Sequence, residues 1–139
     1  KVHEMVIRGL EDAGPDNPKL EALRRTPQLS RDAVYAGDFG ALGKAMIVNT
    51  EAQRELHPKL VSGEAQQVID IAKAYGALGW KVNGAGGEGG SITILTGPSM
   101  SRKRQMVQAI EQTKPLFQSI PIYLSRLGLR VWSREPDHV

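Results

Sequence analysis

Residues 80–90 read WKVNGAGGEGG and are followed at once by SITIL at 91–95, and this junction decides the fold. Five of the seven residues from Gly84 to Gly90 are glycine. The segments on either side, WKV and SITIL, are rich in residues that favour β-strands, and apolar residues alternate with other residues along them. The sequence therefore predicts two strands joined by a loop much longer than the two residues of a tight hairpin.

The glycine loop has two interpretations from its composition alone. Residues without Cβ can turn their N–H groups toward one concave spot and bind phosphate oxygens there. The other interpretation is structural, either a long hairpin loop without a ligand or glycines that allow close packing of the backbone. The loop is not a P-loop, because it lacks the G-x-x-x-x-G-K-[ST] spacing and precedes a strand rather than a helix.

Helical patterns lie on both sides of this hairpin. Ser62 is predicted to cap a helix that ends near Gly76 or Gly79. Its apolar residues fall at i, i+3, i+4 and i+7, namely Ala65, Val68, Ile69 and Ala72. After the hairpin, residues 100–113 predict a second amphipathic helix, capped by Ser99 or Ser101. The spacing of the apolar residues thus changes from about 3.6 residues in the first helix to 2 residues in the strands, and returns to about 3.6 residues in the second helix.

Two breaks are expected upstream. The AGPDNP segment at 13–18 ends a first helical pattern, and Pro27 is expected to separate a short helix from a new one capped by Ser30. That new helix reaches residue 56, and AGD at 36–38 is a point at which it can divide in two.

Downstream, SIPIYLSRLGLRVWS at 119–133 predicts two further β segments around residues 126–128, with Gly128 as a turn or bulge residue. The combined patterns predict an α+β fold, with an antiparallel sheet of about four strands and helices packed on one face.

The composition limits the chemistry. With 139 residues the chain predicts a single domain, and the absence of cysteine excludes disulfides and thiolate metal sites. His3, His57 and His138 are too far apart in sequence to suggest a metal site. No apolar run is long enough to span a membrane and no leader pattern opens the sequence, so we expect a cytoplasmic protein.

The chain opens at Lys1 without methionine, in a segment that already has helical spacing, and we expect it to be part of a longer protein. Within the single domain 1–139, residues 1–28 are interpreted as a helical lead-in and 134–139 as a frayed tail.

Residues 49–95 carry a resemblance to a known family. Their order of helix, serine-capped helix, strand, glycine loop and strand resembles the C-terminal domain of the GHMP kinases, the superfamily of galactokinase, homoserine kinase and mevalonate kinase. The matching positions are Gly76, Ala77, Gly79, Lys81, Gly84, Ala85, Gly86, Gly87, Gly89 and Gly90. The segment GDFGALGKAM at 37–46 matches as well. Departures from the family pattern fall at Trp80, Asn83 and Glu88.

The resemblance implies a ferredoxin-like fold and the transfer of the γ-phosphoryl group of ATP to a small metabolite, with Mg²⁺. The nearest branch is that of sugar and heptose-phosphate kinases. In this family the catalytic residues and most contacts to ATP and Mg²⁺ come from an N-terminal domain that these residues do not include. The resemblance implies that the loop lines the nucleotide and substrate cleft through Asn83, Gly84, Ala85, Gly86, Gly87, Glu88, Gly89, Gly90 and Ser91, with Lys81 in support. It implies no catalytic residue and no metal ligand in this chain, which alone is expected to be inactive.

Two other classes of function are weighed against the kinase. The first is a separate α+β module that binds an anionic metabolite or regulates another protein. The second is a nucleic-acid-binding domain, suggested by the net charge of +3, the pI of about 9.3 and the basic run at 101–104. Aromatic residues make up only 5% of the chain, too few for the stacking surface that such a domain needs. We therefore expect a small molecule and ATP as ligands, no nucleic acid and no membrane, and the sequence leaves the oligomeric state open.

Overall fold

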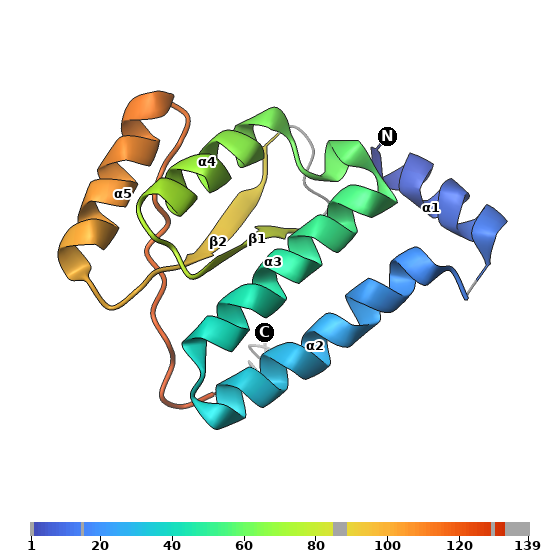
Figure 1. Ribbon diagram of the computed structural model, residues 1–139, viewed down its shortest axis with the longest axis horizontal. Coiled ribbons are helices and arrows are strands. Elements are labelled where there is room, and N and C mark those ends of the chain that lie inside the picture. Colours follow the sequence, from blue (N-terminus) through green and yellow to red (C-terminus); the bar gives the residue numbers. More distant parts are fainter. Residues whose placement is uncertain (1, 15, 85–88, 129, 133–139) are drawn as a thin grey trace, which may run out of the picture.

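The computed structural model describes residues 2–14, 16–84, 89–128 and 130–132 and contains both helices and strands (Figure 1). The elements in chain order are α1 (Val2–Ala13), α2 (Pro18–Ala36), α3 (Phe39–Leu56), the short 3₁₀ helix η1 (Pro58–Leu60), α4 (Gly63–Ala74), β1 (Gly79–Asn83), β2 (Ser91–Leu95) and α5 (Met100–Thr113). The expected α+β class is therefore confirmed.

The predicted hairpin is present. Strands β1 and β2 pair antiparallel, with Trp80 opposite Ile94 and Asn83 opposite Ser91. Strand β1 of the hairpin contacts both α3 and α4 (Figure 1). The buried core joins β1 to α4 and to the segment before it, through Val61, Ala65, Ile69, Trp80 and Val82. Burial of this apolar face fixes the register of the hairpin, because a shift by one residue would turn Lys81 into the core.

Helix α3 closes the outer edge of β1. The side chain of Thr50 is fully buried, and its hydroxyl donates to the Trp80 carbonyl at 3.2 Å and accepts from the Val82 N–H at 3.3 Å. About two turns earlier in the same helix, Gly43 lies directly against Gly79 and the Leu78 carbonyl. This close approach of two backbones is possible only without side chains at the two glycines.

The predicted helix caps at Ser62 and Ser99 are present. The Ser62 Oγ accepts from the Ala65 N–H at 3.1 Å, and the Ser99 Oγ accepts from the Arg102 N–H at 3.4 Å. Gly76 follows the end of α4 with a φ of 74°, which a residue with a side chain rarely adopts.

The α2–α3 pair confirms one expected break and corrects another. The helices divide at Gly37, in the left-handed conformation, and Asp38 caps α3. Pro27, however, lies inside α2, which continues through Ser30, so the predicted cap at Ser30 is wrong. Pro27 has no N–H for the Leu23 carbonyl, and the Thr26 hydroxyl donates to that carbonyl instead, at 2.9 Å.

The predicted third and fourth strands are the main correction. Residues 114–128 and 130–132 form neither helix nor strand, and the described part of the chain contains one sheet of two strands. A strand requires a partner edge for its N–H and C=O groups, and the 119–128 segment pairs with none. Its apolar side chains are exposed accordingly, and that of Leu124 is completely exposed. The predicted tail at 134–139 and residue 133 lie outside the described residues.

Membrane-spanning helices and clustered metal ligands are both absent from the described part of the chain. No helix among the described residues is long and apolar enough to cross a membrane. The same residues contain no group of three or more His, Cys, Asp or Glu side chains placed to hold a metal ion.

Candidate functional site

The base of the glycine loop is formed by the polar face of the hairpin. Lys81 is opposite Thr93 and Asn83 is opposite Ser91, so these four side chains share the face that points away from Trp80 and Val82. Three of the six described site residues predicted from the sequence, Lys81, Asn83 and Ser91, are thus brought together here. The other three, Gly84, Gly89 and Gly90, continue from the two strand ends.

Asn83 ties the two strands together where the loop begins. Its Nδ2 donates to the Ser91 Oγ and to the Thr93 Oγ1, each at 3.0 Å. The Thr93 hydroxyl donates in return to the Asn83 Oδ1 at 3.3 Å. These bonds hold the first and last residues of the predicted loop site at a fixed separation.

Gln53 of α3 holds the next residue of the loop. Its Nε2 donates to the Gly84 carbonyl at 3.1 Å. Gly84, Gly89 and Gly90 have φ values of 64°, 94° and 99°, conformations that residues with a Cβ rarely adopt. The loop therefore requires glycine at these three positions. Ala85, Gly86, Gly87 and Glu88 lie outside the described residues.

Lys81 supplies a positive charge beside the loop. Its ammonium group donates to the Val82 carbonyl at 3.0 Å. Burial lowers the pKa of Lys81, because desolvation disfavours the charged form. An anion bound beside Lys81 would offset that desolvation by pairing with the ammonium group.

Two buried polar side-chain atoms have no hydrogen-bond partner among the described residues. They are the Gln53 Oε1 and the Trp80 Nε1. Trp80 is 7% exposed and belongs to the core, and the Lys73 ammonium lies 5.1 Å from its ring centre. The Trp80 indole therefore packs inward and does not form a stacking surface for a base.

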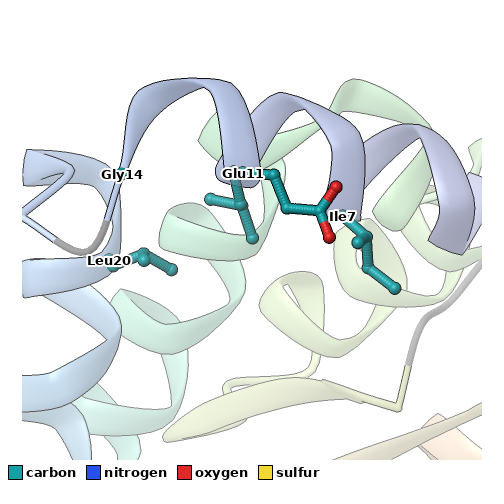
Figure 2. Close-up of a pocket in the computed structure, with 5 residues that line it drawn as sticks. Ile7, Glu11, Gly14 and Leu20 are labelled. Carbon is teal, nitrogen blue, oxygen red and sulfur yellow. The ribbon is translucent and has the colours of Figure 1, made fainter.

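Two cavities lie outside the glycine loop. A cavity of about 350 Å³ between α1 and α2 is lined by Ile7, Leu10, Glu11, Gly14 and Leu20 (Figure 2). Its only charged lining residue is a carboxylate, so it does not suit a phosphate. A second cavity, of about 330 Å³, lies beside the start of α5 and is lined in part by Arg102 and Lys103. All four residues of the basic run 101–104 are exposed, so the run forms a solvated face of α5.

The comparison with protein families matches residues 30–113 to the model described as GHMP kinases C terminal. The chain belongs to the GHMP kinases. The match covers more than half of the chain and includes α3, α4, both strands, the glycine loop and α5. A search of curated proteins finds none that matches this chain.

Membership of the GHMP kinases confirms the resemblance drawn from residues 49–95. It places the chain in a family of phosphotransferases and identifies the matched region as the C-terminal part of such enzymes.

Sequence reasoning missed two residues of this site. Thr93 completes the Asn83 network, and the period-two alternation of SITIL could have identified it, since Thr93 shares a face with Ser91. Gln53 lies 31 residues before the carbonyl that it holds. No local pattern points from a helical glutamine to a loop so far along the chain.

Replacing Asn83 by alanine tests whether the network orders the loop. We expect Asn83→Ala to cost about 1 kcal/mol of unfolding free energy and to accelerate hydrogen exchange at the Gly84, Gly89 and Gly90 amides. Asn17→Ala is the matched control, because it removes an asparagine cap at the start of α2 for a similar cost of about 1 kcal/mol. Equal loop exchange in the two variants would contradict an ordering role for Asn83.

Proposed function

We propose that this chain is the C-terminal lobe of an ATP-dependent small-molecule kinase and that its loop from Asn83 to Ser91 lines the nucleotide and substrate cleft. The observation that carries the proposal is the glycine loop itself. Its described glycines all have positive φ, and its ends are held by Asn83 and Gln53. Such a loop can bring backbone N–H groups close to a ligand without intervening side chains.

Phosphoryl transfer suits a lobe of this kind. The reaction requires that the acceptor is positioned against the γ-phosphate and that the negative charge of the phosphate is neutralised. The protein itself needs to make few covalent bonds. Lys81 and backbone N–H groups of the loop can contribute to both requirements. Glu88 in the loop would repel a phosphate placed against it. We therefore assign the phosphate contacts to the backbone N–H groups of the loop glycines and none to the Glu88 side chain.

The remaining groups are assigned to an N-terminal half. As the family resemblance implies, Mg²⁺ and the catalytic acid or base are proposed to be held there. A sugar or sugar phosphate is proposed as the acceptor. The reason is that the sequence motif G-x-K-V-x-G-A-G-G at residues 79–87 most resembles the sugar and heptose-phosphate kinase branch of the family. The isolated chain is accordingly proposed to be inactive.

A loop variant tests the proposed role in a polypeptide that joins this chain to a GHMP kinase N-terminal half. Gly90→Val forces a branched side chain into a backbone with φ of 99°, and we expect kcat/KM for ATP to fall by about 10- to 100-fold. Gly37→Val is the control, because Gly37 also has positive φ but lies in the α2–α3 turn. A Gly90→Val enzyme as active as the Gly37→Val enzyme would refute the role of the loop.

A further inference from the structure

The cavity beside the start of α5, which we call the α5 cavity, lies at the end of the hairpin opposite the glycine loop. At this end α4 leads into β1 and β2 leads into α5 (Figure 1), and the Leu78 N–H donates to the Leu95 carbonyl at 2.8 Å. From Gly79 to Asn83, β1 extends about 13 Å at roughly 3.3 Å per residue. The α5 cavity is therefore separate from the glycine loop.

The charged residues that line the α5 cavity are both basic. They are Arg102 and Lys103, in the first turn of α5, and no described aspartate or glutamate belongs to the lining. Tyr75 and Thr96, which line the cavity as well, carry hydroxyl groups. Two cationic side chains and two hydroxyl groups around one cavity suit a ligand with several negatively charged oxygen atoms.

The positive charges of Arg102 and Lys103 are not balanced by a carboxylate of the described residues. The ion pairs in that part of the chain involve neither side chain. Both residues are exposed, so a solute can reach them from the surrounding water. An anion that binds here would therefore pair with two cations without displacing a carboxylate from either of them.

The Arg102 guanidinium lies against backbone that has no side chain. A Cβ added to Gly76 would be 3.3 Å from the Arg102 Nη1, and a Cβ added to Gly97 would be 3.9 Å from the Gly76 carbonyl oxygen. The two glycines thus keep side chains out of the space beside the guanidinium. The planar guanidinium can donate two parallel hydrogen bonds to the oxygens of a phosphate group.

The size of the cavity limits the ligand. Its volume of about 330 Å³ is near the lower end of the roughly 300–1,000 Å³ of small-molecule sites. Leu78 and the buried side chain of Met106 add apolar lining that can pack against the carbon atoms of a ligand. A nucleic acid would need a longer basic surface, because it binds through an extended row of phosphates. The α5 cavity therefore suits one small molecule.

We propose that the α5 cavity is a second binding site of this chain, for a small phosphorylated metabolite whose phosphate oxygens pair with Arg102 and Lys103. The site lies at the other end of β1 from the glycine loop and does not depend on the proposed kinase function. The phosphate supplies the negative charge that the described residues do not provide to these two side chains.

Titration of the ¹⁵N-labelled intact chain with glycerol 3-phosphate tests the proposal, because the amide signals that shift locate the bound anion. We expect saturable shifts at the Gly76 and Gly97 amides that exceed those at Gly84 and Gly90. Glycerol, which lacks the phosphate, should produce no saturable shift. Arg102→Gln removes the guanidinium and is expected to weaken the binding of glycerol 3-phosphate about 10-fold.

Arg104→Gln is the matched control, because Arg104 belongs to the same exposed basic run but does not line the cavity. It removes the same charge, and solvent screening should keep its effect below about 3-fold. Circular dichroism checks that both variants keep the fold.

Three results would overturn the proposal. The first is the absence of any saturable shift with glycerol 3-phosphate. The second is larger shifts at Gly84 and Gly90 than at Gly76 and Gly97, which would place the anion at the glycine loop. The third is a weakening in Arg102→Gln no greater than in Arg104→Gln. In that case Arg102 would serve only to complement the negative C-terminal end of α4, and the anion would be attracted by overall charge alone.

Discussion

Gly43→Ala and Gly79→Ala are each expected to lower the free energy of unfolding by at least about 3 kcal/mol. A Cβ on Gly43 would overlap the Leu78 carbonyl, and a Cβ on Gly79 would overlap the backbone of Gly43. Both obstacles are backbone atoms, so no side-chain rotation can relieve them. Helix α3 would have to move away from β1, and the Thr50 bonds to that strand would be lost with it.

Urea unfolding followed by circular dichroism measures this effect, and Gly63→Ala is the control. Gly63 begins α4, and a Cβ added there would meet no atom within 4 Å. Alanine at this position should therefore be neutral or stabilising by up to about 1 kcal/mol. Stability of either close-contact variant within the range of Gly63→Ala would contradict the packing of α3 on β1.

Thr50→Val is expected to cost about 2–3 kcal/mol. Valine has nearly the shape of threonine, so the change removes the hydroxyl with little change in volume. The Trp80 carbonyl and the Val82 N–H would then lose their partner in a fully buried position. The loss of unfolding free energy in Thr50→Val therefore measures how much the Thr50 hydroxyl stabilises the fold through its bonds to the outer edge of β1.

Thr50→Ser distinguishes this cause from a packing defect. Serine keeps the hydroxyl and loses only a methyl group, so we expect a loss of about 1 kcal/mol. Hydrogen exchange at the Val82 amide should rise strongly in Thr50→Val and little in Thr50→Ser. Equal unfolding free energies for the two variants would mean that the hydroxyl does not close this edge.

Local signals predicted much of this fold. The hairpin followed from the period-two patterns around the glycine loop, and the caps at Ser62 and Ser99 followed from side chains that bind N–H groups a few residues away. The long helical pattern divided at 36–38, where Gly37 ends α2 in the left-handed conformation and the Asp38 side chain caps α3. Each of these features is set by residues that are close neighbours in sequence.

The features that sequence analysis missed depend on distant residues. Pro27 is tolerated because Thr26 takes over its carbonyl, and Asn49 in turn donates to the Thr26 Oγ1 at 2.7 Å, across 23 residues. The expected strands within 119–133 are absent from the described residues, where no part of 119–128 pairs with a strand. Local preference alone does not decide whether a β-forming segment finds a partner edge.

The candidate site shows the same division. Asn83, Ser91 and the described loop glycines were named from the sequence, because the family motif is contiguous there. Gln53 was not, since it reaches the loop only through the packing of α3 beside β1. The local motif identified the loop, and tertiary structure identified what holds it.

The most direct test of the proposed kinase function measures ATP-dependent phosphate transfer to a panel of sugars and sugar phosphates. The isolated chain is compared with a polypeptide in which a GHMP kinase N-terminal half precedes it. We predict transfer by the longer polypeptide to at least one acceptor and none above the enzyme-free rate by the isolated chain. Transfer by the isolated chain, or by neither protein, would contradict the account.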